Sequence, residues 1–332
     1  MHALFYLGTE SLAYRRAPDP VPSDGQSLVR ITAAGICGSD MHAYHGLDAR
    51  RVPPMILGHE LAGTVESGPL RGQRVAINPM LTCHNCRECL AGNPNRCQQR
   101  DLLGLGQAGG FANLVTVDSR NLYTLPDDLS LVDASLMEPT AVSVHAVVMA
   151  ERALTRPLSE CRVLVIGGGA IGLLAALIVR NKGARSLHVA ETNAPRRETL
   201  KQLDTGIVFD PLSGDQPSES TFDLVIDAVG SGATRAMASA LVRAGGVISH
   251  VGLQDDKPGL DTRKLTLQEV TFIGHYTYSP IDLKAALDLI HRGALGPLDW
   301  VEQQPLSKGA DAFRSIHTGT AASPKIVLLP SE

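Results

Sequence analysis

The chain has 332 residues, of which 44% are hydrophobic and 19% are charged. That length accommodates two domains of about 150 residues each, and the apolar content excludes a disordered tail. A formal net charge of −4 argues against a dedicated nucleic-acid binder, because such proteins are usually basic. The start, MHALFYLGTE, has no signal-peptide pattern, and the longest uncharged run (163–179) is glycine-rich and marginal for a membrane span. We therefore expect a cytoplasmic protein that does not interact with membranes.

The first 130 residues predict short β-strands. The expected strands are rich in β-branched residues and are bounded by Gly, Pro or Asp. They are 28–36, 61–67, 73–79 and 111–117. No long stretch with the hydrophobic periodicity of a helix lies between them.

The pattern changes at 132–150, where an apolar run predicts a buried helix. Strands and helices then alternate, with strands expected at 161–167, 186–191, 207–210, 223–229 and 245–252, and helices at 170–184 and 195–203. Strands that are apolar on both faces and alternate with helices indicate a doubly wound parallel sheet. A further strand is expected in PKIVLLP at 324–330, returning to the first domain.

The first of these βα turns carries a glycine motif. Gly167, Gly169 and Gly172 fit G-x-G-x-x-G, with Ile171 inside the motif. The pattern follows a strand and opens a helix, which is the context that dinucleotide binding requires. The first glycine permits the tight turn, the second lets a pyrophosphate approach, and the third lets the helix pack on the strand. A glycine-rich turn without a cofactor is the alternative.

An acid ends the next predicted strand. Glu191 can accept hydrogen bonds from the adenosine ribose and would repel a 2′-phosphate, which favours NAD over NADP. Arg196 and Arg197 point the other way, because a nearby arginine can accept that phosphate.

Four of the six cysteines crowd into a short segment. Cys83, Cys86, Cys89 and Cys97 read C-x2-C-x2-C-x7-C. Four thiolates can close a tetrahedral zinc shell with no open position, which makes a structural site. An iron–sulfur cluster and unligated thiols are the alternatives.

A second group of metal-binding residue types lies in the strand-rich region. Cys37 opens CGSDMH, and His59 and Glu60 follow Gly58. Cys, His and carboxylate suit a catalytic zinc that leaves one position for water or substrate. Each residue alone is ambiguous, since a lone Cys or His is usually a packing residue.

At these motifs the chain resembles the zinc-dependent medium-chain dehydrogenases, and among them the polyol (sorbitol- and idonate-type) branch. The resemblance runs in family order from about residue 30 to 255, over the stretches GICGSDMHAYHG, PMILGHELAGTV, the four-Cys segment, LMEPTAVSVHA, VLVIGGGAIGLL, VIDAVG and GGVISHVGL. Several motifs in one order are far more specific than any one alone.

The resemblance implies an α/β protein of two domains: a GroES-like β-barrel catalytic domain at 1–135, completed by 300–332, and a Rossmann domain at 136–299. It implies one catalytic and one structural zinc per subunit, with the active site in the cleft. The catalytic zinc ligands would be Cys37, His59 and either Glu60 or Glu138. Where Glu60 is a direct ligand, Glu138 would hold the zinc-bound water. A buried carboxylate or a helix N-terminal charge is the plain alternative for either acid.

The resemblance also assigns a proton path. Ser39 would take the proton from the alcohol and pass it through the cofactor ribose, and His42 would release it to solvent, while Asp40 would orient a ligand. Cofactor contacts are expected from Val251, Gly252 and Leu253 and from the segment that begins at His275. The family's usual assembly implies a homodimer or homotetramer.

Two departures from sorbitol-type enzymes concern the substrate. Ala43 follows the relay histidine where a Tyr is common, and HYTY at 275–278 replaces a stretch with an Arg-Tyr pair. A polyol, a sugar acid and a simple secondary alcohol all remain open as substrates. The alternatives to NAD-linked oxidation are an NADP-linked aldehyde or ketone reductase and a non-catalytic nucleotide sensor.

Overall fold

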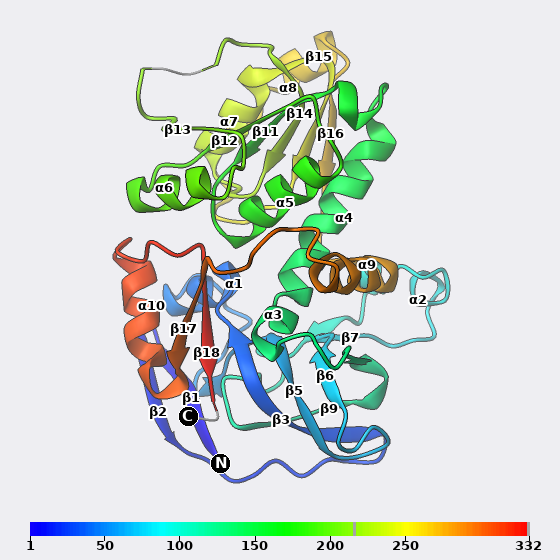
Figure 1. The fold of residues 1–332 in the computed structure, drawn as a ribbon, viewed down its shortest axis with the longest axis vertical. Helices are drawn as coiled ribbons and strands as arrows, with labels where there is room; N and C mark the ends of the chain where they lie inside the picture. The colour runs from blue at the N-terminus through cyan, green and yellow to red at the C-terminus, as the bar shows by residue number, and fades with distance from the viewer. Residues whose placement is uncertain (215–216, 331–332) are drawn as a thin grey trace. The chain divides into compact units, whose positions relative to one another are not determined.

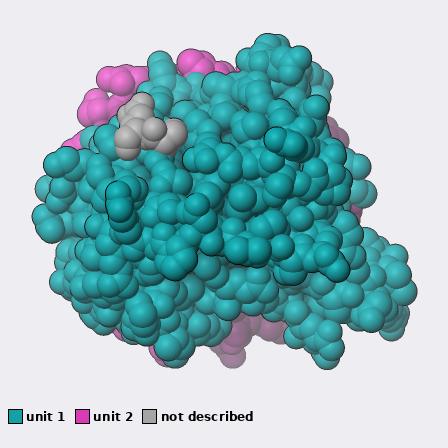
Figure 2. Space-filling view, turned by 90° about the horizontal axis from the view of Figure 1, so that it is seen from below, with its two compact units in different colours: residues 1–138, 279–292, 298–332 teal, residues 139–278, 293–297 magenta. Residues whose placement is uncertain are grey.

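The computed structural model describes residues 1–214 and 217–330, which form two compact units (Figures 1 and 2). Unit 1 contains Met1–Glu138, Ser279–Arg292 and Leu298–Glu332, and unit 2 contains Pro139–Tyr278 and Gly293–Pro297. Among the described residues, no helix is both long and apolar enough to cross a bilayer.

Unit 1 is built mainly of strands. They are β1 (His2–Gly8), β2 (Ser11–Arg16), β3 (Gln26–Gly35), β4 (Met55–Ile56), β5 (Glu60–Ser67), β6 (Arg74–Ile77), β7 (Met80–Leu81), β8 (Asp101–Leu102), β9 (Leu114–Asp118), β10 (Leu122–Thr124), β17 (Val301–Pro305) and β18 (Lys325–Leu329). The largest sheet has the order β10-β6-β5-β3-β18-β17, with β9 also paired to β3. The strand closest to the C-terminus, β18, thus lies antiparallel to β3, near the N-terminus.

Alternation along β3 explains the core of this sheet. Val29, Ile31 and Ala33 are fully buried, while Arg30 between them is exposed. Successive side chains of a strand point to opposite faces, so this pattern turns one apolar face inward. Short helices complete unit 1: α1 (Gly38–Tyr44), α2 (Arg87–Leu90), η1 (Pro94–Arg96), η2 (Ser119–Asn121), α3 (Leu131–Ser135), α9 (Pro280–His291), η4 (Leu306–Lys308) and α10 (Gly309–His317).

Unit 2 is a parallel sheet with helices. Its strands are β11 (Arg162–Ile166), β12 (Ser186–Ala190), β13 (Ile207–Phe209), β14 (Phe222–Asp227), β15 (Val242–His250) and β16 (Thr271–Gly274). Its helices are α4 (Met137–Ala153, entering from unit 1), η3 (Leu158–Glu160), α5 (Ala170–Asn181), α6 (Ala194–Gln202), α7 (Gly232–Leu241) and α8 (Thr262–Leu267). The strand order is β13-β12-β11-β14-β15-β16, with every neighbouring pair parallel. In such sheets ligands bind beyond the carboxyl ends of the strands where the order reverses, here between β11 and β14.

The helix expected at 132–150 is divided into α3 and α4 at Leu136. Ser130 caps α3 by accepting a hydrogen bond from Asp133 N at 3.0 Å. Pro139 is the third residue of α4. Proline has no N–H and is tolerated in the first turn of a helix but not in the interior, so one continuous helix would place it badly.

Candidate active site

Cys37 is positioned by the start of α1. It is the N-cap residue, and its Sγ accepts a hydrogen bond from Ser39 N at 3.5 Å. Asp40 closes the capping box, because its carboxylate accepts from Cys37 N at 3.0 Å. The thiol is therefore fixed by the same contacts that begin the helix.

Cys37, His59 and Glu60 come together, each offering one ligand atom within 4.8 Å of the others. His59 and Glu60 are buried, and Cys37 is half-buried. A thiol, an imidazole and a carboxylate in one cluster are the donor set of a catalytic zinc site. The residues present therefore fit the metal.

Glu60 also forms a buried ion pair that sequence reasoning missed. Lys325 Nζ donates to both carboxylate oxygens, at 2.7 and 2.6 Å, and to Ile36 O at 2.8 Å. The carboxylate packs directly over Gly35, where an added Cβ would lie 2.0 Å from Glu60 Oε2. Burial lowers the pKa of Lys325, but Glu60 outweighs burial and the net pKa is raised, so the lysine is charged. The sequence feature that could have indicated this pair is the single lysine that begins the otherwise apolar strand KIVLL.

Asp40 lies behind His59. Its Oδ1 is 3.5 Å from His59 Nδ1, and both side chains are buried. Burial lowers the pKa of His59, yet the charges of Asp40 and Cys37 outweigh it and hold that pKa well above the ordinary value. A carboxylate beside the second ring nitrogen is the usual way to orient a metal-binding histidine.

Ser39 and His42 are one turn apart on α1, so both side chains lie on one side of the helix. Arg51, which sequence reasoning also missed, donates from Nη2 to Ser39 Oγ at 3.2 Å. The pKa of His42 is lowered, chiefly by partial burial and further by Arg51, while Asp48 opposes the shift.

Glu138 is a buried residue of the first turn of α4 and is close enough to contribute to the raised pKa of Lys325. Among the described residues, the group of mutually close ligand atoms contains Glu60 and does not contain Glu138.

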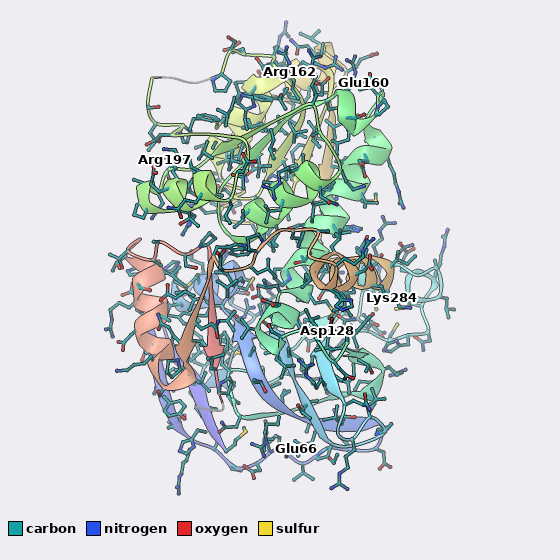
Figure 3. All side chains as sticks on the ribbon, in the orientation of Figure 1. Glu66, Asp128, Glu160, Arg162, Arg197 and Lys284 are labelled. Atoms are coloured by element: carbon teal, nitrogen blue, oxygen red, sulfur yellow. The ribbon has the colours of Figure 1, made fainter. Side chains whose placement is uncertain are left out.

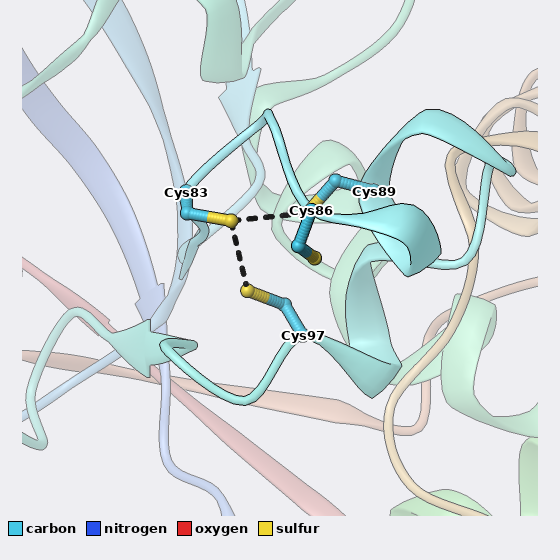
Figure 4. A group of neighbouring side chains, drawn as sticks. All are labelled: Cys83, Cys86, Cys89 and Cys97. Carbon is cyan, nitrogen blue, oxygen red and sulfur yellow. Dashed lines mark hydrogen bonds between the residues drawn. The ribbon is translucent and has the colours of Figure 1, made fainter.

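The four cysteines of the separate lobe also converge (Figure 4). Cys83 Sγ lies 3.9 Å from Cys89 Sγ and 3.5 Å from Cys97 Sγ, and Cys86 completes the group. Backbone N–H groups of Asn85 and Cys86 lower the pKa of Cys83 to about 6, so its thiolate is readily formed. These residues form the structural zinc site expected from their spacing.

The glycine turn has the shape that a pyrophosphate needs. Gly167 has φ +94°, and a Cβ on Gly172 would lie 1.8 Å from Gly167 O, so both positions require glycine. A Cβ on Gly169 would meet no atom of the described residues within 4 Å, which leaves open space at this N-cap of α5. Ile171 lies in the first turn of that helix.

Glu191 follows β12 and is held by the backbone. Its Oε2 accepts from Gly168 N at 2.8 Å and its Oε1 from Asn193 N at 2.7 Å. Arg196 Nη1 is 3.4 Å from Glu191 Oε2. Arg197, on α6 (Figure 3), instead binds backbone carbonyls and Asp210.

The remaining predicted cofactor contacts follow β15 and β16. Val251 N and Gly252 N both donate to Asp227 O, at 2.9 and 3.0 Å, while Leu253 is exposed. His275 is buried and its N donates to His250 O at 2.9 Å. The structure thus places these segments at the carboxyl edge of the parallel sheet.

Comparisons with known proteins agree with this arrangement. The alcohol dehydrogenase GroES-like domain model matches residues 23–127, and the zinc-binding dehydrogenase model matches residues 170–292. The chain is 31% identical over 308 residues to L-galactonate-5-dehydrogenase of Escherichia coli K12, covering 89% of this chain and 88% of the relative. It is 31% identical over 299 residues to L-idonate 5-dehydrogenase of Vitis vinifera, covering 83% and 80%.

Two solved structures share the fold with 26% sequence identity. A zinc-binding dehydrogenase of Sinorhizobium meliloti 1021 bound to NADP has a TM-score of 0.87 and covers 99% of each chain. Acetophenone reductase of Geotrichum candidum in complex with NAD has a TM-score of 0.86 and covers 99% of this chain and 97% of its own. The expected family and the expected fold class are both confirmed. The chain belongs to the zinc-containing medium-chain dehydrogenases and is an NAD(P)-dependent zinc alcohol or polyol dehydrogenase.

Proposed function

We propose that this enzyme oxidises a secondary hydroxyl of a polyol or sugar acid to a ketone, with NAD as the hydride acceptor. The observation that carries the proposal is the cluster of Cys37 with the buried residues His59 and Glu60, next to the serine and histidine of α1. The 31% identical relatives named for L-galactonate and L-idonate support a sugar acid or its polyol as the substrate class.

Cys37, His59 and Glu60 would hold the catalytic zinc, which supplies a Lewis acid that lowers the pKa of a substrate hydroxyl. Glu60 is favoured over Glu138 as the third protein ligand, because among the described residues it belongs to the mutually close group. Lys325 does not prevent this, since each carboxylate oxygen has a lone pair left after accepting from the lysine.

Ser39 and His42 would carry the proton away. Ser39 Oγ accepts the proton of the substrate hydroxyl as it gives up its own, and the proton that leaves Ser39 is passed on to His42, which releases it to solvent. The lowered pKa of His42 keeps its imidazole neutral near pH 7 and therefore able to accept a proton.

Glu191 supports NAD as the preferred cofactor. Two backbone N–H groups fix its carboxylate at the end of β12, where it would accept hydrogen bonds from ribose hydroxyls and repel a 2′-phosphate. Gly167, Gly169, Ile171 and Gly172 would hold the pyrophosphate at the start of α5. The segment Val251, Gly252, Leu253 and the buried His275 would contact the nicotinamide end.

An NADP-linked aldehyde or ketone reductase is the second candidate. Arg196 favours it, because its guanidinium lies beside Glu191 and its buried Nε has no hydrogen-bond partner among the residues that the structure describes. A 2′-phosphate could satisfy that donor.

Assembly is a further part of the proposal. One edge strand of the six-stranded sheet is β16, and Phe272 on that strand is exposed. We expect two copies of the chain to associate at this edge, as a homodimer or as half of a homotetramer.

The direct test measures reduction of NAD and of NADP at 340 nm with L-galactonate, L-idonate, polyols and simple secondary alcohols. We expect turnover of a sugar acid or polyol with NAD, and its loss in Cys37→Ser. A preference for NADP with ketone reduction would favour the second candidate. No turnover of any compound by zinc-loaded protein would contradict both.

A further inference from the structure

Arg51 is a buried cation in the segment that connects α1 to β4. It is 3% exposed, and four of its hydrogen bonds are formed within unit 1. Nε donates to Gly104 O at 2.8 Å, and Nη1 donates to Ser39 O at 3.1 Å and to Asp48 Oδ2 at 2.6 Å. A buried guanidinium is costly unless it is paired in this way, so the surrounding loops are organised around it.

The fourth contact is of another kind. Arg51 Nη2 donates to the side-chain oxygen Oγ of Ser39 at 3.2 Å. The bonds to the backbone carbonyls and to Asp48 are enough to hold the loops together. The bond to Ser39 Oγ additionally orients a side-chain hydroxyl. A serine oxygen has two acceptor positions and one hydrogen. With one position taken by the guanidinium, one acceptor position and the O–H remain.

A proton relay requires one free acceptor position and one O–H on the same oxygen, and Ser39 retains both. As Ser39 passes on a proton, one O–H bond forms with the incoming proton and one O–H bond breaks, so the serine is unchanged. Negative charge develops on Oγ when its own proton leaves first. A fixed cation at hydrogen-bond distance stabilises that charge without reorganising during the reaction.

Two carboxylates lie near the Arg51 guanidinium, and neither displaces its hydrogen bond to Ser39 Oγ. Asp48 lies 2.6 Å from Nη1, on the side of the guanidinium that also binds Ser39 O, and Asp40 Oδ1 lies 3.9 Å from Nη2. Asp40 is also the carboxylate that faces His59. One buried guanidinium thereby joins the relay serine to the residue that orients a metal ligand.

We propose that Arg51 is a positioning residue that fixes the Ser39 hydroxyl for proton transfer and stabilises charge on its oxygen. This inference rests on the proposed proton path through Ser39. It does not require Arg51 to touch the substrate.

The test is a double-mutant cycle of Arg51→Lys and Ser39→Ala, measured with the best substrate of the panel above in H2O and in D2O. Lysine keeps the charge but cannot span the serine, Asp48 and Gly104 together. We expect Arg51→Lys to lower kcat about tenfold, to leave KM within about twofold and to raise the solvent isotope effect. In the Ser39→Ala background, Arg51→Lys should lower kcat no further.

Arg50→Lys is the matched control. Arg50 also binds Asp48, from its Nε at 2.8 Å, but its side chain is 65% exposed. We expect its kcat and isotope effect to equal those of the parent protein. If Arg51→Lys does not fold, judged by melting and zinc content, Arg51→Gln replaces it in the cycle, because Arg50 still pairs with Asp48.

The outcomes separate the two proposals. If Ser39→Ala retains the parent kcat, the proton path is wrong and this inference fails with it. If Ser39→Ala is slow but Arg51→Lys lowers kcat by the same factor in both backgrounds, the proton path stands and Arg51 has only a structural role.

Discussion

Lys325 Nζ donates to both carboxylate oxygens of Glu60, at 2.7 and 2.6 Å, so a residue of the C-terminal strand neutralises an acid of the catalytic metal cluster. Both side chains are almost completely buried. Removing one member of a buried ion pair leaves an uncompensated charge in a low-dielectric site. The last strand of the chain therefore takes part in the electrostatics of the metal site.

Lys325→Met should lower the free energy of unfolding by about 3–5 kcal/mol, because Glu60 loses its counter-charge in the protein interior. Urea unfolding of protein from which the catalytic zinc has been removed measures this, because a zinc ion bound to Glu60 would itself supply a counter-charge. The double variant Lys325→Met with Glu60→Gln should recover part of the loss, since no buried charge is then unpaired. A single-variant loss below about 1 kcal/mol would show that the pair contributes little.

Cys97→Ser should reduce the zinc content from two atoms per chain to one, because the four-cysteine lobe loses a ligand. The lobe should also become sensitive to proteolysis, since metal binding is coupled to its folding. Elemental analysis and limited proteolysis measure the two effects. Cys161→Ser is the control, because Cys161 is a buried thiol outside the group. Unchanged zinc in Cys97→Ser would contradict a structural site there.

Much of the candidate site could be predicted from local sequence patterns. The four cysteines lie within fifteen residues and the glycine turn within six, so the sequence displays each complete motif. The break between α3 and α4 could also have been predicted, because Pro139 is favoured in the first turn of a helix and disfavoured in its interior.

Contacts between distant segments could not be predicted in this way. Glu60 and Lys325 are 265 residues apart, and they come together because β18 pairs with β3 and β3 pairs with β5. Arg51 stands in a segment without periodicity, and nothing in the letters RRVPP distinguishes it from exposed Arg50. A single sequence shows which residues can do chemistry but not which buried cation will contact which oxygen.

Glu191→Ser should shift cofactor preference toward NADP. The change removes a fixed negative charge from the ribose site and leaves Arg196 free to bind a 2′-phosphate. We expect the ratio of kcat/KM for NADP to that for NAD to rise at least about tenfold. Glu198→Ser, which removes an exposed acid paired with Lys201 on α6, should leave the ratio unchanged. No change in the Glu191 variant would remove this residue from the specificity argument.

His275 should make unit 2 less stable in mild acid. Burial, assisted by His145 and His250, lowers its pKa from 6.5 to about 4. Between these two values the unfolded chain binds a proton that the folded protein does not, so stability rises with pH. The contribution is complete above pH 6.5 and is lost as the pH falls from 6.5 toward 4.

His275→Asn removes this titration, so the free energy of unfolding of the variant should fall less between pH 6.5 and 4 than that of the parent. The expected difference is roughly 1–3 kcal/mol, the upper value being the full pKa shift without solvent screening. Subtracting the two pH profiles cancels acid effects that both proteins share, including loss of zinc. Parallel profiles would mean that the pKa of His275 is the same in the folded and unfolded states, and therefore that burial does not lower it.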